Sequence, residues 1–431
     1  MNIILYNGTL VDVKRKQLIP NSSVTIRGEK IEQIFPSGEN LPEDYEKKID
    51  CTGKFILPGL SDMHIHLRSS LFQGPTSDTP NRAITNGGQI DDILVSRLHS
   101  YLYCGVTSIY DAGNFENVIF KLRDMERKGE ITSPRIFCTG NLLTCPEGHG
   151  SYVGLEISSL PQDDEKIKRF LSRKPDLAKI TYDEHNWGIR PLIPILERET
   201  LGSIIRRCHD NCLRVTVHVS NEYRAREAIY AGADALAHPV IQSPMTQEFA
   251  WLLSEKKIPT VTTLQIGEGY SRLAETPEYL KEGFYRDCIE ETERERLMTI
   301  ECKKQRENIW AAWMKIMTPV AQKNLFMLSE AGGIIVTGTD GTTGPDLHRE
   351  LELLQEAGLP PLEIIKATTY NSAIFLNIES VLGSVEPGKF ADLVVVDQDP
   401  SVDVKNLSYI STVIKDGIII NRNNLKLPVN S

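Results

Sequence analysis

Eight strand-like runs alternate with helical patterns through the middle of this chain, and this alternation constrains its fold more than any other feature. The runs end near His66, Tyr110, Thr139, Thr181, His218, Ala237, Thr263 and Thr339. Repeated strand and helix units predict a parallel sheet covered by helices, and eight of them predict an α/β fold of the (β/α)8 TIM barrel type. Sites in such barrels gather at the carboxyl ends of the strands.

Both ends of the chain contain short β-prone runs separated by turns, unlike the middle. We predict that residues 1–57 and 381–431 pair into one small β-sandwich domain beside a barrel formed by residues 58–380. A charged helical insertion at about residues 270–327 is too long for a single crossover connection. We expect this insertion to be a solvated cover rather than a substrate lid.

Charge and composition narrow the class of partner. The 431 residues carry a formal net charge of -10, and the sequence pI is about 5.5. Nucleic acids and anionic membranes usually require a basic surface, so we expect a small-molecule substrate, no nucleic acid and no membrane partner. No secretory segment is recognisable, and eight scattered cysteines do not resemble a disulfide framework. We therefore expect a cytoplasmic protein, with homo-oligomerisation left open.

Metal-ligating residue types follow several of the predicted strands. His64 and His66 share one face of their strand because residues i and i+2 point to the same side. His218, His238 and Asp340 come at the ends of later strands. Imidazole and carboxylate groups together suit zinc or a similar divalent ion, and the carboxylate can also take a proton from metal-bound water.

Lys179 stands inside the otherwise apolar run Ala178-Lys179-Ile180. A buried lysine is costly unless it is neutralised or paired. Carbamylation by carbon dioxide would turn its amine into an anionic ligand with two oxygens, able to bridge two metals. The alternative is a lysine whose amine reaches solvent.

Further candidates lie in the loops. Two histidines are predicted to contact substrate: His149, between Gly148 and Gly150 after the third strand, and His185, after the fourth. Arg68 and Arg82 are candidates for binding a substrate carboxylate. Cys208-His209-Asp210-Asn211-Cys212 suggests a second metal cluster, but it precedes the fifth strand and lies away from the catalytic rim, so we expect a structural role.

The ordered set His64, His66, Lys179, His218, His238, Asp340 resembles the amidohydrolase superfamily of metal-dependent hydrolases. The run Phe55-Ile56-Leu57-Pro58-Gly59-Leu60 before His64, and Gly383 to Val394 near the end, are similar to the family as well. The resemblance is nearest to imidazolonepropionase-like enzymes and to Xaa-Pro or other dipeptidases. Those dipeptidases have a tyrosine where this chain has Ser220, which counts against dipeptide recognition.

The resemblance implies a binuclear site with two divalent ions, zinc by default. His64, His66 and Asp340 would hold one ion and His218 and His238 the other, with a hydroxide and the carbamate of Lys179 between them. Asp340 would take a proton and pass it to the leaving amine. We expect hydrolysis of an amide-type C–N bond in a linear amide, N-acyl amino acid, dipeptide or cyclic amide. The alternatives are a mononuclear deaminase of an aminated heterocycle and a non-catalytic structural relative.

Overall fold

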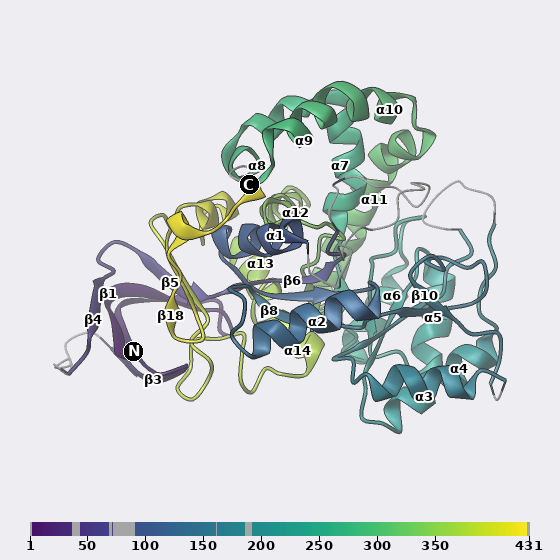
Figure 1. The fold of residues 1–431 in the computed structure, drawn as a ribbon, viewed down its shortest axis with the longest axis horizontal. Coiled ribbons are helices and arrows are strands. Elements are labelled where there is room, and N and C mark those ends of the chain that lie inside the picture. The colour runs from purple at the N-terminus through teal and green to yellow at the C-terminus, as the bar shows by residue number, and fades with distance from the viewer. Residues whose placement is uncertain are drawn as a thin grey trace.

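The computed structural model describes residues 2–36, 44–68, 71, 91–160, 162–185 and 192–428. Its centre is the predicted barrel, with a β domain on one side (Figure 1). One barrel strand lies at each of the eight predicted places: β6 (Leu60–Ile65), β7 (Val106–Asp111), β8 (Arg135–Cys138), β11 (Ala178–Thr181), β12 (Val215–His218), β13 (Ala235–Leu236), β14 (Thr260–Val261) and β15 (Ile335–Val336). The TIM barrel prediction is confirmed.

The barrel strands run parallel and close into a ring. Regular pairing joins β6 to β8 and β11 to β15. Backbone hydrogen bonds complete the ring at both breaks, from Met63 to Thr337 and from Asp176 to Cys138, each 2.9 Å long. All carboxyl ends of these strands therefore open at one mouth.

Amphipathic helices surround the barrel and bury their apolar faces against it. They are α1 (Asp92–Tyr103), α2 (Glu116–Arg127), α3 (Asp164–Ser172), α4 (Arg198–His209), α5 (Glu222–Ala231), α6 (Gln247–Glu255), α11 (Ile309–Glu330) and α12 (Pro345–Glu356), followed by α13 (Pro361–Ala367) and α14 (Tyr370–Leu376). Phe375 of α14 packs with barrel-strand residues such as Met63 and Val336 in a separate buried cluster. No helix within the described ranges is long and apolar enough to cross a membrane.

The two chain ends form one curled sheet, as predicted. Its strands are β1 (Asn2–Asp12), β2 (Gln17–Arg27), β3 (Lys30–Phe35), β4 (Lys47–Asp50), β5 (Phe55–Pro58), β16 (Leu393–Val396), β17 (Ile410–Lys415) and β18 (Ile418–Ile419). The antiparallel pair of β5 and β16 joins the amino-terminal and carboxyl-terminal halves, with Leu57 opposite Val394. The domain limits at residues 57 and 381 stay a prediction.

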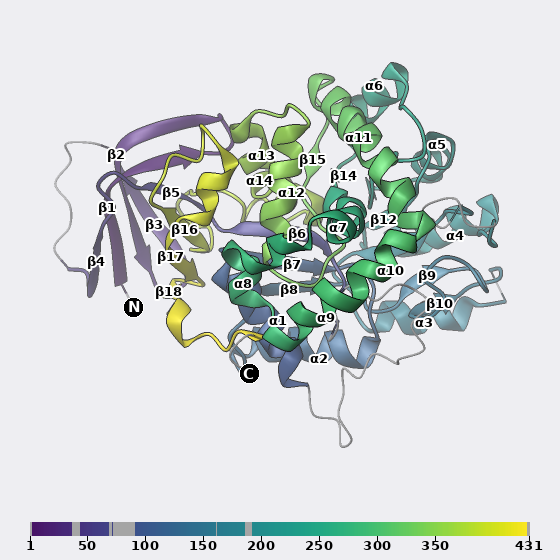
Figure 2. The same cartoon turned by 90° about the horizontal axis from the view of Figure 1, so that it is seen from above.

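Helices α7 (Leu264–Glu275), α8 (Gly283–Cys288), α9 (Glu291–Arg296) and α10 (Cys302–Glu307) form a cover between β14 and α11. Seen from above, they lie over the barrel (Figure 2). The cover has an apolar core of its own, which includes Leu273, Leu280 and Leu297. The insertion predicted at about residues 270–327 overlaps these helices, and its limits stay a prediction.

One part of the mouth differs from the expected loop. Between β8 and β11 the chain forms two additional short strands, β9 (Leu142–Thr144) and β10 (Gly154–Glu156). β9 pairs with both β10 and β11. Three residues are too few to show a two-residue hydrophobic period, so these strands leave no signal in the sequence.

Candidate metal centre

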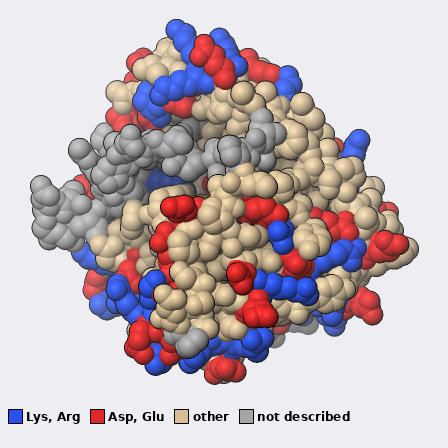
Figure 3. Space-filling model, turned by 90° about the vertical axis from the view of Figure 1, so that its right-hand side faces the viewer, with Lys and Arg blue, Asp and Glu red and all other residues tan. Residues whose placement is uncertain are grey.

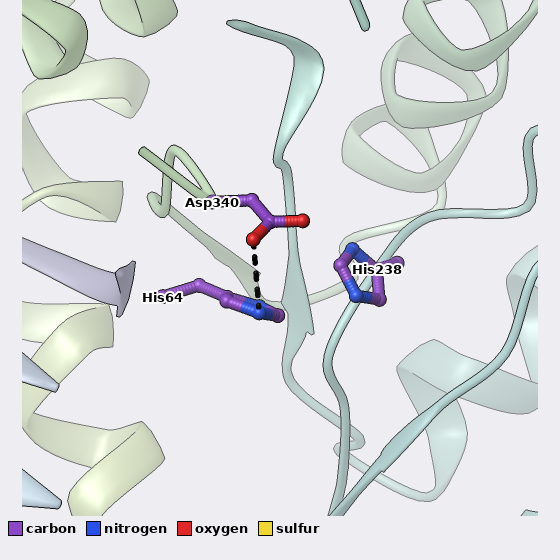
Figure 4. Close-up of side chains that lie close together, drawn as sticks. All are labelled: His64, His238 and Asp340. Atoms are coloured by element: carbon purple, nitrogen blue, oxygen red, sulfur yellow. Dashed lines mark ion pairs between the residues drawn. The ribbon is translucent and has the colours of Figure 1, made fainter. Parts of the chain in front are cut away.

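Six side chains predicted as metal ligands come from the carboxyl-terminal parts of five barrel strands or the residues just after them. The side chains of His64, His238 and Asp340 lie close together at the mouth (Figure 4), with one possible ligand atom of each within 4.8 Å of the others. In the described part of the chain, no other group of three His, Cys, Asp or Glu side chains meets this criterion. Their spacing and donor chemistry fit a divalent ion.

Two histidines have their inner ring nitrogens fixed by backbone carbonyls. His64 Nδ1 lies 2.9 Å from the Ala237 carbonyl oxygen, and His66 Nδ1 lies 2.7 Å from that of Gly113. A carbonyl oxygen only accepts hydrogen bonds, so each Nδ1 must donate. In a neutral imidazole this leaves Nε2 with its lone pair free to bind a metal. His66 Nε2 is 3.2 Å from Asp340 Oδ1, and His64 Nε2 is 3.9 Å from the same oxygen.

Lys179 lies inside the same cluster rather than reaching solvent. Its side chain is buried, and its Nζ is 3.1 Å from His64 Nε2. Burial lowers the pKa of Lys179 to about 7, although the charges of Asp340 and Asp111 act in the opposite direction. A large fraction of the amine is therefore neutral near pH 7, which is the form that reacts with carbon dioxide.

His218 and His238 lie next to each other, with ring centroids 4.3 Å apart, and the His238 ring is 4.5 Å from that of His64. Burial lowers the pKa of both His218 and His238, so their neutral, metal-binding form is favoured. The Nε2 of His218 faces Asp183 at 3.3 Å, whereas His238 Nδ1 faces the Thr263 hydroxyl at 2.9 Å. His218 is thus close to the cluster but outside its tightest group.

Asp183 is a site residue that the sequence analysis missed. It is buried at the end of β11 and accepts a 2.7 Å hydrogen bond from the hydroxyl of Ser220. Burial raises the pKa of Asp183, but hydrogen bonds from His218 and Ser220 outweigh this and hold it below its usual value. Its position two residues after the strand, like that of a ligand, was the available signal. The Ser220 hydroxyl thereby fixes this carboxylate.

Asp340 is held in an unusual conformation by its neighbours. Its φ of 56° lies in the left-handed region. The preceding residue, Thr339, donates from its backbone N–H and its hydroxyl to the buried carboxylate of Asp62, at 3.0 and 2.8 Å. Burial raises the pKa of Asp340, but the neighbouring His64, His66 and Lys179 side chains hold it well below its ordinary value. Asp340 therefore remains an acceptor at neutral pH.

A cavity adjoins the cluster. His66, Arg68 and Asp340 line one part of it, whereas Ile266, Tyr270, Tyr285 and Ile289 of the cover line another. The inner face of the cover thus forms part of the cavity wall, a role that the expectation of a solvated cover did not include. Arg82 lies outside the described residues.

The two loop histidines differ in position. The ring of His149 stacks on His218, with centroids 4.1 Å apart, and its carbonyl accepts hydrogen bonds from the Thr144 and Thr181 hydroxyls. The imidazole of His185 is instead 37 % exposed and lies 3.9 Å from Glu184. The structure brings the His149 ring to the cluster, whereas His185 lies beside Glu184 of its own loop.

Acidic and basic side chains are interspersed on the face of the molecule drawn in Figure 3. On α5, for example, Arg224 pairs with Glu227 and Arg226 with Glu222. These pairs balance charge locally on the outside of the barrel. The buried histidines of the site and Lys179 lie instead inside the barrel.

Comparisons with known proteins show which proteins this chain is similar to. The profile described as Amidohydrolase family matches residues 55–420. Imidazolonepropionase from Clostridium tetani is 24 % identical, with 95 % of this chain and 93 % of that protein covered. Adenine deaminase from Rubrobacter xylanophilus is 34 % identical over 68 residues, but this match spans only 16 % of this chain and 11 % of that protein.

Among solved structures, a Xaa-Pro dipeptidase with bound methionine in the active site superposes with a TM-score of 0.77. It is 23 % identical, and the match covers 97 % of this chain and 100 % of the dipeptidase. At this level of identity the likeness concerns the fold, a TIM barrel with a β-sandwich domain.

Proposed function

The chain belongs to the amidohydrolase family, and from that premise we propose that it is a metal-dependent hydrolase of an amide-type C–N bond. The observation that carries the proposal is the buried group formed by His64, Lys179, His238 and Asp340 at the barrel mouth. Three neutral nitrogen donors and one carboxylate converge there beside a cavity. Burying polar groups is costly, and groups whose pKa values are shifted by burial cluster at functional sites.

We assign His64, His66 and Asp340 to one metal and His218 and His238 to a second, with the carbamate of Lys179 between them. The Lys179 amine attacks carbon dioxide, forming an N–C bond and releasing one proton. Its pKa of about 7 supports this step because the neutral amine is abundant. Two bound divalent ions, zinc by default, would polarise a carbonyl and lower the pKa of water.

The side chains of the site have separate tasks. Asp340, ionised and beside the cavity, takes a proton and gives it to the leaving nitrogen. His149, stacked on His218, is assigned to the substrate or its oxyanion, and His185 to the outer rim. The apolar residues of the cover exclude water from the reacting group.

The cavity also supports a substrate with a carboxylate. Arg68 lines it together with His66 and Asp340, and its Nη2 lies 3.3 Å from the Tyr152 hydroxyl. The acidic group Asp346, which lines the same cavity, is already held by Gln265 and Tyr285. An N-acyl amino acid with an apolar side chain therefore suits the cavity, since it offers an anion for Arg68 and an apolar part for the cover.

A matched pair of substrates tests this proposal. We expect metal-loaded protein to hydrolyse N-acyl amino acids, and chelation to abolish the activity. Replacing the substrate carboxylate by a carboxamide, or Arg68 by Gln, should each raise KM about tenfold, as the loss of a charged hydrogen bond predicts. The two changes combined should raise KM little more than either change alone, because both remove the same interaction. Equal KM values for acid and amide would contradict the role of Arg68, and chelator-resistant hydrolysis would contradict the metal.

One observation favours a second candidate, a mononuclear deaminase. The tightest ligand group takes His64 and Asp340 from one predicted metal set and His238 from the other, which is the arrangement a single ion needs. This candidate predicts one metal per chain and release of ammonia from an aminated heterocycle. Ammonia release without amide hydrolysis would select it.

A further inference from the structure

The turn between β14 and α7 combines a strained residue with an unusual helix cap. Thr263 is the residue before the first turn of α7, and it has φ 38° and ψ 40°. A β-branched residue rarely adopts this left-handed conformation, so the surrounding structure must impose it. Such strain is retained where neighbouring contacts fix the backbone.

The hydroxyl of Thr263 does not cap its helix. A threonine at this position normally accepts a hydrogen bond from a backbone N–H of the first turn. Here the Thr263 side chain makes no such bond, and its Oγ1 lies 2.9 Å from Nδ1 of His238 instead. The group that would stabilise the helix is thus directed at the metal centre.

Glu350 of α12 supplies the missing cap. Its two carboxylate oxygens accept the backbone N–H groups of Leu264 and Gln265, at 3.0 and 2.6 Å. The side chain is fully buried, and burial raises its pKa to about 7 despite these hydrogen bonds. Helix amino ends favour a negative group, which explains why an acid is stable at this buried position.

The same turn is tied to the strand that carries Asp340. The backbone N–H of Thr263 donates to the Gly338 carbonyl at 2.9 Å, two residues before Asp340. On its other side, the amide side chain of Gln265 donates to Asp346 in the cavity wall at 3.1 Å. A shift of this turn would therefore move the partner of His238 and part of the cavity wall together.

We propose that Glu350 and Thr263 act as a positioning relay for His238. Glu350 replaces the threonine as the cap of α7 and holds the left-handed turn, which frees the Thr263 hydroxyl to orient the His238 ring. The Thr263 hydroxyl can accept a hydrogen bond from Nδ1–H of His238, and in that tautomer Nε2 is left unprotonated for a metal. This inference rests on the proposed metal-dependent function, and both residues are positioning rather than catalytic residues.

Cobalt binding tests the relay before any substrate is added. We expect Glu350→Gln to weaken Co²⁺ affinity about tenfold or more, the size of effect seen when a partner of a metal ligand is lost. Glu356→Gln is the control, because Glu356 lies on the same helix, its side chain is 52 % exposed, and it pairs with Arg349 rather than with the backbone of α7. Equilibrium dialysis gives the affinity, and the visible spectrum of Co²⁺ reports the geometry of its ligands.

A second pair of variants keeps the test sharp if Glu350→Gln does not fold. Thr263→Ser retains the hydroxyl and should bind Co²⁺ like the unaltered protein, whereas Thr263→Val retains the shape and should lose about tenfold in affinity. Equal affinities and spectra for Thr263→Ser and Thr263→Val would overturn the relay. Absence of Co²⁺ binding by the unaltered protein would instead overturn the proposed function and, with it, the relay.

Discussion

Two regions of the barrel contain dense sets of metal-ligating residue types, and they differ in their position in the barrel and in the burial and pKa of their side chains. The mouth cluster, formed by His64, Lys179, His238 and Asp340, lies at the carboxyl ends of the strands. The foot motif, Cys208 to Cys212, lies between the end of α4 and the start of β12, at the opposite end. By local sequence density the foot motif is the more conspicuous of the two.

The foot motif is fully accounted for by ordinary structural contacts. His209 Nε2 lies 2.8 Å from Asp234 Oδ2, which also accepts the Val215 backbone N–H at 2.7 Å. Burial raises the pKa of the Cys208 thiol to about 12, which disfavours the thiolate that a metal needs. Cys212 is exposed. The expected structural role agrees with these contacts.

The mouth cluster has the opposite character. Its histidines and Lys179 are buried, and burial is the main cause that lowers the pKa of each of these side chains. The end of the strand on which a residue lies is therefore more informative than how closely the candidate ligands are spaced in the sequence. Changes at the two regions should therefore have very different effects.

The largest difference is expected in catalysis. Asp340→Asn keeps the size of the side chain but removes the group that takes the proton, so kcat should fall about 1,000-fold, within the range for a general acid or base. His209→Gln at the foot motif should change kcat less than about twofold. Steady-state kinetics with metal-replete proteins check both values. An Asp340→Asn enzyme within tenfold of the unaltered one would break the comparison.

A second difference concerns pH and stability in the metal-free protein. The pKa of Lys179 falls from 10.5 to about 7 on folding, so between these values the unfolded chain holds a proton that the folded chain has lost. The free energy of unfolding should therefore rise with pH across this window. Below pH 7 Lys179 is protonated in both states, so it adds no further pH dependence there.

Lys179→Met isolates this contribution. Relative to Lys179→Met, the unaltered protein should gain about 1 to 3 kcal/mol in unfolding free energy between pH 7 and pH 9.5, measured with urea in carbon-dioxide-free buffer with chelator. Lys415 is the control, since it is a lysine of low exposure paired with Glu126 at 2.8 Å. Lys415→Met should destabilise the fold by leaving that acid unpaired. Parallel pH profiles for the unaltered protein and Lys179→Met would contradict a neutral Lys179.

The smallest effect is expected at the foot motif. The ion pair of His209 with Asp234 is partly exposed, with the histidine side chain 40 % accessible. Exposed pairs contribute little, so His209→Gln should change the unfolding free energy by less than about 1 kcal/mol and leave the metal content unaltered. Loss of metal in this variant would show that the foot motif had been misread.

The sequence predicted the barrel and the positions of the mouth residues because strand ends and buried charge follow from periodicity and chemistry. Lys179 stood out as a lysine in an apolar strand, and Asp340 as a carboxylate after another. The cap formed by Glu350 was not predictable, since it joins two helices through the three-dimensional packing of α12 against α7. Nor was the role of Tyr285 and Ile289 in the cavity, because their insertion showed only charge and helical periodicity.

In our proposal, the mouth cluster is a metal centre completed by Lys179. The decisive experiment is elemental analysis of protein loaded with zinc in bicarbonate, with ¹³C NMR after labelling with ¹³CO₂. We expect two metal ions and one carbamate per chain, with the carbamate and at least one ion absent from Lys179→Met. One ion and no carbamate signal, unchanged in Lys179→Met, would contradict the binuclear centre, and no bound ion would contradict the metal site itself.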